Sequence, residues 1–406
     1  MRCLISAPVI LTMKHSIVTV LVSFAVLSAM LCVPVVRGGV ESEAPSRVYF
    51  AKTLPSFYRG NFNETLNHLN RNLRDAIRIE QTNQQVFLWL DSLCYWTLKG
   101  ECHFQMVQHD EALLAYTTAL KIYLDHSDWL CSISISAKPK MRSRESLPWG
   151  ASSRTGNVGD FSQCRFKIDQ DYFNIVPIAN QGEPNRQTLT DIHADHIVRC
   201  LALAIRRRAE ILGSLSQTDS EMKTLAEVLA SRPHLPNHFA ASWVDVLYGL
   251  VLSAMKDDNN AEIQLTKGLL MMGEFDHQLT AVALNELGHI ALRNENPKVA
   301  RTHYLEASIA AYRMGNDPVL LGETFRNMAN AHRLTHDTLP FPSIIAATDY
   351  FRASRNVSPL TLLPLMQEKS KYSIAPHRID VSKKARRAGI FSSSRFIDCF
   401  RRNRSL

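Results

Sequence analysis

An internal repeat is the feature that most constrains how this chain can fold. Residues 93–126 and 281–314 share a pattern of small and aromatic residues, and each match lies 188 positions further along the chain. A small residue lets one helix approach its partner closely, and alanines flank an aromatic side chain on one face of the next helix. Each segment therefore predicts two antiparallel helices packed together. The matched pairs are Trp96 with Leu284, Gly100 with Gly288, Ala112 with Ala300, Tyr116 with Tyr304 and Ala119 with Ala307.

At these two segments the sequence resembles the tetratricopeptide repeat family. Weaker copies extend the resemblance over about residues 45–355. The resemblance implies an all-α fold, an α-solenoid of antiparallel helix pairs in which each pair contacts only its neighbours. The weaker copies are a helix pair at 242–271, a further pair formed by 320–334 and 344–354, and the turn and second helix of a degenerate first unit at 58–66.

The repeats divide the chain into five parts. In the middle part, Ser, Gly, Pro and basic residues are followed by residues 166–169 and 172–176, which alternate or cluster like short strands. We therefore expect an irregular insertion with short strands, after which helical periodicity resumes at 189–215 and 219–230. The five parts are a targeting segment at 1–38, N-terminal helix pairs at 45–130, the insertion at 131–187, C-terminal helix pairs at 188–355 and a basic tail at 356–406.

The amino end has the organisation of a targeting segment. A short basic stretch at 13–15 precedes an almost entirely apolar run from Ile17 to Pro34, and small residues follow up to Gly38. We expect a signal peptide cleaved after Gly38, with residues 1–12 as an upstream extension. The alternative is an uncleaved anchor, because residues 16–34 approach the roughly twenty residues that span a bilayer. Either reading predicts export to the periplasm or cell envelope, with membrane anchoring in the second.

The positive charge of the chain is confined to its tail. The whole chain has a formal net charge of +8, and residues 357–406 alone hold eleven Lys or Arg against three acidic residues. We expect this tail to be poorly ordered, with contact to a membrane surface as the alternative, because clustered cations and spaced phenylalanines suit anionic lipid. Nucleic acid is not an expected partner, since the body of the chain is neutral and the targeting segment argues against the cytoplasm.

The sequence has no motif of a known catalytic site. It contains no Gly-rich phosphate loop, HExxH, GxSxG or CxxC. We therefore expect no enzymatic activity and no cofactor. His193, His196 and Cys200, with Asp191 or Asp195, would share one helix face that suits a metal ion, but polar helix faces also arise without one, and we predict no metal site. The pair of cysteines that brackets the insertion, and that a disulfide would join, is Cys131 and Cys164.

The family resemblance points to a peptide-binding groove. In tetratricopeptide arrays the first helices of successive units line a concave surface, and side chains three, four and seven residues apart meet the ligand. Their guanidinium and amide groups could bind the carboxylates of an acidic or C-terminal peptide. The alternative is that they are ordinary hydrated surface residues. The implied groove residues are Asn285, His289 and Arg293 in one unit and Arg326, Asn330 and Arg333 in the next.

Two classes of function are compatible with this organisation. The first is an exported, non-enzymatic scaffold that holds a peptide or a partner protein, possible membrane contact being made by residues 16–34 or by the tail. The second is an enzyme or ligand-binding protein whose site lies in residues 132–187, framed by the repeats. A cavity with convergent titratable residues beside the insertion would favour the second class, and an open groove would favour the first.

Overall fold

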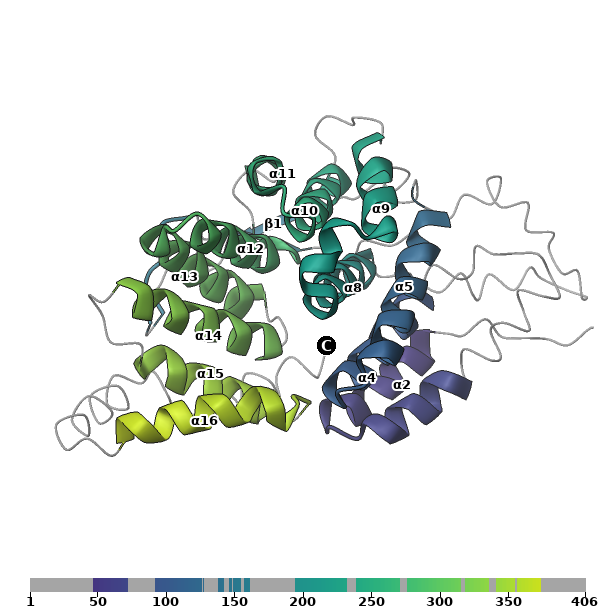
Figure 1. Ribbon diagram of the computed structural model, residues 1–406, viewed down its shortest axis with the longest axis horizontal. Helices are drawn as coiled ribbons and strands as arrows, with labels where there is room; N and C mark the ends of the chain where they lie inside the picture. The colour runs from purple at the N-terminus through teal and green to yellow at the C-terminus, as the bar shows by residue number, and fades with distance from the viewer. Residues whose placement is uncertain are drawn as a thin grey trace, which may run out of the picture. The chain divides into compact units, whose positions relative to one another are not determined.

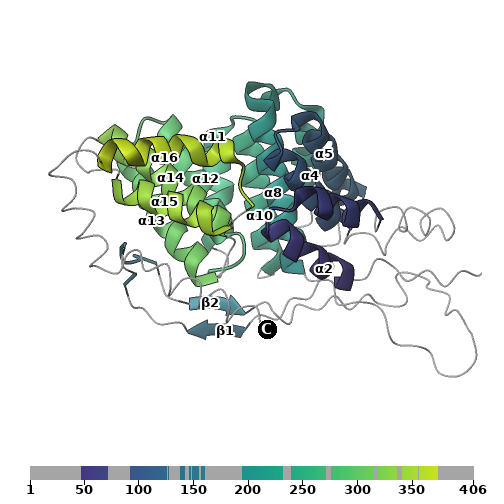
Figure 2. The same ribbon diagram turned by 90° about the horizontal axis from the view of Figure 1, so that it is seen from below.

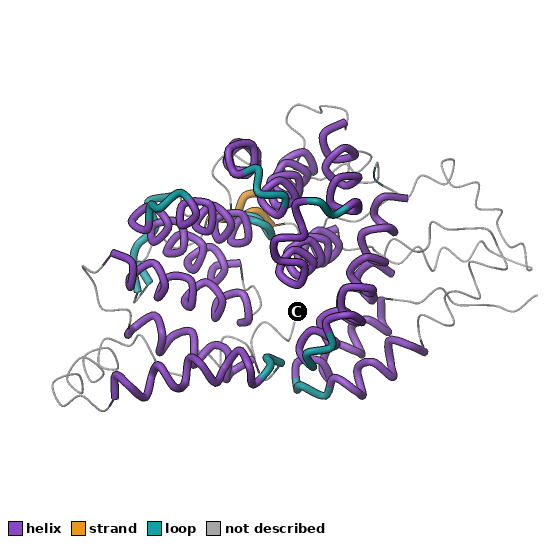
Figure 3. The backbone as a smooth tube through the Cα atoms, in the orientation of Figure 1, coloured by secondary structure: helices purple, strands orange, loops and turns teal. Residues whose placement is uncertain are grey.

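The described part of this computed structural model belongs to one compact unit, residues 44–406. It is almost entirely helical, and neighbouring helices pack in pairs, as the sequence predicts (Figure 1). Figure 3 shows how little of this part is loop. The described residues are 47–71, 92–125, 127, 138–141, 146–147, 149–154, 157–160, 194–231, 239–270, 276–314, 318–335, 341–354 and 356–373.

The helices follow the expected order along the chain. Residues 62–71 form a helix after α2, and a short 3-10 helix, Gly213–Gln217, follows α8. The labelled α-helices are α2 (Arg47–Tyr58), α4 (Ser92–Gln105), α5 (His109–Asp125), α8 (Ala194–Leu212), α9 (Ser220–Ser231), α10 (Phe239–Ala254), α11 (Asp258–Leu270), α12 (Thr280–Arg293), α13 (Pro297–Met314), α14 (Pro318–Thr335), α15 (Phe341–Ser354) and α16 (Pro359–Ser373).

The two best-matched segments form the predicted helix pairs, α4 with α5 and α12 with α13. In both pairs a glycine of the first helix faces the ring of a tyrosine of the second. A Cβ atom at Gly100 would lie 2.5 Å from Cε1 of Tyr116, and one at Gly288 would be as close to the ring of Tyr304. Both tyrosine rings are fully buried. The small residue is therefore what allows the two helices to approach, as the spacing predicts.

Two further pairs have the same kind of contact, in which a glycine of the first helix faces a large side chain of the second. In the predicted pair α10 and α11, a Cβ atom at Gly249 would lie 2.6 Å from Cγ of Leu265. In the pair α14 and α15, Gly322 faces the ring of Phe351 at the same distance. This last contact was not evident from the sequence, because the loop between the two helices is longer than in the other pairs.

One tight turn recurs between the helices of four pairs. Its central residue has a positive φ, which is 79° at Gly60, 64° at Val107, 65° at Lys256 and 57° at Glu295. The next residue donates its backbone N–H to the carbonyl five residues earlier, which satisfies an end of the first helix. These hydrogen bonds are Asn61 to Ser56 at 3.0 Å, Gln108 to His103 at 2.9 Å, Asp257 to Leu252 at 2.9 Å and Asn296 to Ala291 at 2.8 Å.

The described part of the insertion lies on the C-terminal helices. Strands β1 (Lys138–Met141) and β2 (Asn157–Asp160) form a two-stranded antiparallel sheet (Figure 2). Between them, Trp149 donates its indole N–H to Oγ of Ser308 at 3.0 Å and packs edge-on against Tyr312 and Phe325. The strands expected at 166–169 and 172–176 lie outside the described residues.

A buried carboxylate holds the segment after Trp149. Glu306 of α13 accepts hydrogen bonds from the hydroxyl of Ser152 at 2.5 Å and from the backbone N–H of Ser153 at 2.6 Å. Arg154 follows at 3.3 Å from the carboxylate of Asp276. Three consecutive residues of the insertion are thus fixed to the helices by polar contacts.

The helical part extends beyond the predicted boundary at 355. Residues 359–373, expected to belong to a poorly ordered tail, form α16, which packs on α15. Leu365 is buried, Glu368 pairs with Arg333 at 2.9 Å, and Lys369 pairs with Asp349 at 3.3 Å. The tail prediction is therefore wrong for these residues, because apolar burial and two ion pairs fix them. Residues 374–406 lie outside the described part.

Several sequence predictions fall outside the described residues. These are the targeting segment at 1–38 and the proposed pair of Cys131 and Cys164. In the described part, Cys94, Cys102 and Cys200 are free thiols. Within that part, too, no helix combines the length and the apolar character needed to cross a membrane.

Candidate functional site

A cavity of about 210 Å³ is lined by side chains of five helices, α2, α4, α8, α12 and α14, and by two residues outside them, Gln278 and Asn356. One part of its wall is apolar and the other carries charged and amide side chains. The apolar lining comes from Leu54, Phe57, Tyr58, Leu98, Leu203, Val282, Val319 and Leu320. The polar lining comes from Thr97, Glu101, His196, Arg199, Cys200, Arg206, Arg207, Gln278, Glu323 and Asn356.

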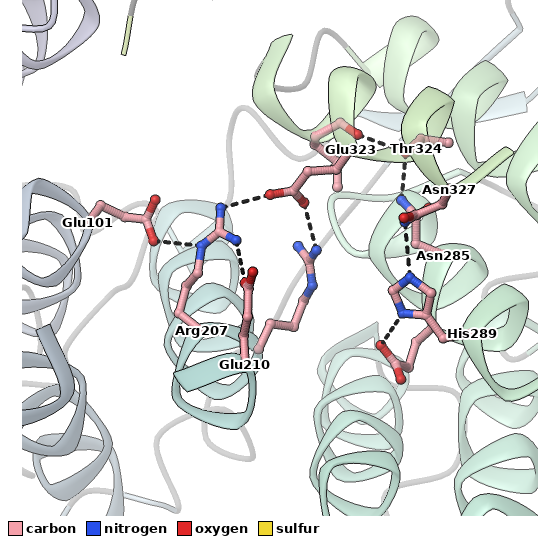
Figure 4. A network of polar contacts seen from close by, with 11 residues as sticks. Glu101, Arg207, Glu210, Asn285, His289, Glu323, Thr324 and Asn327 are labelled. Atoms are coloured by element: carbon pink, nitrogen blue, oxygen red, sulfur yellow. Dashed lines mark hydrogen bonds and ion pairs between the residues drawn. The ribbon is translucent and has the colours of Figure 1, made fainter. Parts of the chain in front are cut away.

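Arg207 of α8 is the centre of a buried charge network at this cavity (Figure 4). Its Nε lies 3.0 Å from Glu101 of α4, and its two terminal nitrogens each lie 2.7 Å from a carboxylate, one of Glu323 on α14 and one of Glu210. The second carboxylate oxygen of Glu323 accepts from Arg206 at 2.7 Å. One guanidinium therefore connects three helices that are distant in the sequence.

The network shifts the pKa values of Glu323, Arg207 and Tyr116. Burial alone would raise the pKa of Glu323, but the guanidinium groups of Arg207 and then Arg206 outweigh it, and the pKa lies well below its usual range. Burial acts against the charge of Arg207 as well, yet Glu101 and Glu323 hold its pKa above the usual value. The phenol of Tyr116 donates to Glu101 at 2.6 Å, and its pKa is raised by burial and then by that carboxylate. Arg207 and Glu323 are therefore both ionised at neutral pH.

Two amide groups of the lining have an unused acceptor. The side-chain oxygens of Gln278 and Asn356 are buried and have no hydrogen-bond partner among the described residues. Gln278 is 6% exposed and Asn356 is 1% exposed. A buried acceptor without a partner is unfavourable, so each of these oxygens lowers the stability of the folded chain.

Asn356 reaches the cavity because the chain after α15 is tied to α4. The backbone N–H of Ser358 donates to Oε1 of Gln105 at 2.6 Å, and both residues are buried. In the first half of α4, the hydroxyl of Thr97 donates to the carbonyl of Cys200 at 3.4 Å. The cavity is thus assembled from segments near both ends of the described chain.

The groove residues predicted on α12 serve contacts within the chain. Asn285 is buried, its amide nitrogen donates to Thr324 at 2.6 Å, and its oxygen has no partner among the described residues. His289 lies 3.2 Å from the carboxylate of Glu286 and 3.0 Å from the amide of Asn327, and Figure 4 shows the contact with Asn327. Both therefore pair helix α12 with its neighbours.

The predicted arginines are also occupied. Arg293 binds both carboxylate oxygens of Asp258, at 2.8 and 2.6 Å, and so joins the end of α12 to the start of α11. Arg333 pairs with Glu368 at 2.9 Å and also donates to Asn330. Arg326 is half-buried, and its charge helps to lower the pKa of Glu323. None of the six predicted residues is part of the cavity lining.

The considered metal ligands are only partly described. His196 and Cys200 both line the cavity from α8, whereas His193 and Asp191 lie outside the described residues. Within the part of the chain that the structure describes, no group of three or more potential ligands could hold a metal ion. No described residue of the insertion contributes to the cavity lining either.

The sequence did contain one signal for the buried network. Arg206, Arg207 and Arg208 interrupt an otherwise apolar stretch of α8, which places at least one cation on a buried face. The structure pairs all three, with Arg208 bound to Asp219 at 2.6 Å. For Gln278 and Asn356 there was no such signal, because both lie outside the helices that the repeat pattern defines.

Comparison with known proteins adds no relative to this description. No family model matches the chain, and no curated protein matches it.

Proposed function

We propose that this protein is a non-enzymatic scaffold, built as a tetratricopeptide-like α-solenoid, that binds a peptide segment of a partner protein in the cavity. The observation that carries the proposal is the origin of the lining. Five helices contribute side chains to one cavity, and four of them, α2, α4, α12 and α14, are the first helices of their pairs. In arrays of helix pairs this is the surface on which ligands bind.

The regularity of the pairs supports the solenoid part of the proposal. Four pairs share a glycine-mediated helix contact, at Gly100, Gly249, Gly288 and Gly322. The turn with a left-handed central residue occurs in three of these pairs, at Val107, Lys256 and Glu295. It also occurs at Gly60, after α2. Equivalent contacts in successive pairs are what an array of similar units requires.

The proposal moves the binding surface away from the residues that the repeat pattern implied. Arg293 and Arg333 already hold carboxylates of this chain, Asp258 and Glu368. An acidic peptide would have to displace them. The cavity, in contrast, offers apolar side chains from five helices.

The location of the scaffold is a second part of the proposal and rests on the sequence alone. The apolar run from Ile17 to Pro34, preceded by basic residues and followed by small ones, is typical of export. We therefore place the helical body outside the cytoplasm, at the cell envelope.

A cavity-filling variant tests the binding function. Leu203 lines the cavity from α8 and is half-buried, so Leu203→Trp would occupy the space where the peptide binds. Leu270 is 68% exposed and is not part of the lining, so Leu270→Trp is the matched control. Tagged wild-type protein and both variants would be used to capture partners from envelopes of the source cells, with quantitative mass spectrometry as the measurement.

We expect one or more proteins to be recovered with the wild type and with Leu270→Trp and to be lost with Leu203→Trp. Circular dichroism must show equal helix content in all three proteins. Equal recovery with both variants would refute binding in the cavity.

A further inference from the structure

We infer that α13, α14 and the residues just before α12 form a second peptide-binding site, which residues 149–154 of the insertion occupy as an autoinhibitory segment. The ligand that competes with this segment is a stretch of a partner protein with the same pattern: tryptophan, glycine, any residue, two hydroxyl residues and arginine. The site is separate from the cavity, because the described helix residues that contact the autoinhibitory segment are not part of the cavity lining.

The helices alone build a pocket for an aromatic side chain. The rings of Tyr312 and Phe325 meet the ring of Trp149 edge-on, with centroids 5.4 and 5.6 Å from it. Phe325 is in turn stacked on Tyr350 of α15. The hydroxyl of Ser308 donates to a carbonyl of its own helix at 2.7 Å, so its oxygen remains to accept the indole N–H. A buried aromatic anchor with a bonded N–H is typical of residues that dominate peptide binding.

The position after the anchor requires a glycine. Gly150 has a φ of 155°, and a Cβ atom there would lie 2.8 Å from Cδ1 of Leu305. Both observations favour glycine over residues with a side chain. Ala151, in contrast, is exposed, so the following position of a ligand is unrestricted.

Two buried carboxylates of the helical part face the autoinhibitory segment. Glu306 is 6% exposed, and its hydrogen bonds with described residues all come from Ser152 and Ser153. Asp276 is 3% exposed and forms an ion pair with Arg154. A buried carboxylate that loses its partner is strongly unfavourable. The surface therefore favours any segment that supplies hydroxyl, backbone and guanidinium donors in this order.

The contact at the end of the autoinhibitory segment is incomplete, which leaves room for a better ligand. Oδ1 of Asp276 lies 3.3 Å from Nη1 of Arg154, but neither atom completes a hydrogen bond with a described residue. A guanidinium that is aligned with this carboxylate gains a charge-assisted hydrogen bond that Arg154 does not make. Ser153 is exposed, so the rest of the described chain does not enclose the segment.

The attachment of the autoinhibitory segment determines how the site responds to a free ligand. An attached segment competes at a high effective concentration. The apparent dissociation constant of a free ligand is raised in proportion, because only molecules with a vacant site can bind it. Substitutions that weaken the attached segment should therefore tighten the binding of a free peptide while the helices stay unchanged.

A free copy of the segment tests this inference on the full chain. The probe is fluorescein-labelled Leu-Pro-Trp-Gly-Ala-Ser-Ser-Arg-amide, the sequence of residues 147–154, and fluorescence anisotropy measures its dissociation constant. Trp149→Ala combined with Arg154→Ala removes the anchors at both ends of the autoinhibitory segment and leaves the helices intact. We expect this double variant to bind the probe at least about tenfold more tightly than the wild type.

Three controls identify the contacts. A probe with alanine in place of tryptophan should not bind the double variant. Glu306→Met, added to the double variant, removes the carboxylate and should weaken binding of the original probe by about tenfold or more. Gly150→Val weakens the autoinhibitory segment but retains both anchors, so it should bind the probe with intermediate affinity. Circular dichroism checks that the helix content of each variant is unchanged.

The outcomes also separate this site from the cavity. Absence of probe binding to both the double variant and Gly150→Val would overturn the inference, because residues 149–154 would then be a permanent brace. Equal binding to the wild type and the double variant would overturn it as well, since no competition would exist. Leu203→Trp, added to the double variant, should leave probe binding unchanged, and its loss would place the probe in the cavity instead. The proposed function is tested by partner capture and does not depend on these results.

Discussion

Nε of Arg207 lies 3.0 Å from Oε1 of Glu101, the same oxygen that accepts a hydrogen bond from the hydroxyl of Tyr116 at 2.6 Å. The side chains of Arg207 and Glu101 are only 6% and 7% exposed. Arg207 also binds Glu323, so its removal would leave the buried carboxylate of Glu101 without its counter-ion and that of Glu323 with Arg206 alone. The consequence should be measurable as a loss of stability.

We predict that Arg207→Met lowers the free energy of unfolding by about 3 to 5 kcal/mol, because breaking a buried ion pair leaves an uncompensated charge. Arg333→Met is the control, since the side chain of Arg333 is 46% exposed in its pair with Glu368, and we expect a loss of about 0 to 1 kcal/mol. Urea denaturation measures both. Similar losses for the two variants would contradict the role assigned to Arg207.

A second prediction concerns the contact between Gly288 and Tyr304. Alanine is about 1 kcal/mol better than glycine in an exposed helix, so Gly288→Ala would stabilise α12 if the site were open. Because its Cβ would overlap the tyrosine ring, we expect Gly288→Ala to lower the free energy of unfolding by about 1 to 3 kcal/mol, and Gly288→Leu by more. A double-mutant cycle with Tyr304→Leu should show strong coupling, whereas additive effects would exclude the contact.

The recurring turn gives a third prediction. Val107 adopts a positive φ, which is unfavourable for a β-branched residue by about 1 to 2 kcal/mol. Val107→Gly should therefore raise the free energy of unfolding by about 0.5 to 1 kcal/mol, after the greater flexibility of glycine in the unfolded chain is subtracted. Gly60→Val, at the equivalent position of the first pair, should lower it. Thermal melts of both variants check the opposite signs.

A fourth prediction compares two truncated chains. A chain that ends after Ser373 retains α16, and a chain that ends after Ser358 loses it. We expect the shorter chain to melt several degrees lower, because it lacks the burial of Leu365 and the ion pairs of Glu368 and Lys369. Equal melting midpoints would show that α16 contributes nothing to the stability of the array.

The fifth prediction is a pH dependence. Burial, and then the charge of Arg154, lower the pKa of His277 to about 3, and its Nδ1 accepts the backbone N–H of Leu279 at 3.2 Å. The unfolded chain binds a proton at this residue near pH 6.5, whereas the folded chain does so only near pH 3. The free energy of unfolding therefore decreases as the pH falls between these values.

His277→Gln removes this contribution. Between pH 6.5 and 3, the free energy of unfolding of the variant should rise relative to that of the wild type by about 1.4 kcal/mol for each unit that the pH falls. Neighbouring Asp276, whose pKa burial raises to about 6, titrates in both proteins and cancels in the comparison. Urea denaturation at several pH values measures the difference, and parallel profiles would contradict the prediction.

The fold was predictable where local sequence and tertiary contact coincide. The spacing of Gly100 and Tyr116, and of Gly288 and Tyr304, encodes the approach of two helices that are adjacent in the chain, so it can be recognised without a structure. Helix α16 lacks that spacing and contains Pro364, which argues locally against a helix. Its formation depends on packing against α15, which the sequence does not reveal.

The candidate site was less predictable because its contacts are long-range. Arg207 is 106 residues from Glu101 and 116 residues from Glu323. From the sequence alone, a charged residue on a helix is expected to be exposed, because its ion-pair partners are not known. The same limit applied to Arg293, which the family resemblance placed in a groove and which the structure pairs with Asp258.

The turn shared by four helix pairs bears on how this architecture can diverge. Its shape is set by main-chain hydrogen bonds, and its left-handed position holds glycine, valine, lysine or glutamate in different pairs. Substitution there changes the free energy by a modest amount and leaves the connection between the helices intact. A helix pair of this kind can therefore be duplicated or exchanged within the array while its sequence diverges, because the turn does not depend on particular side chains.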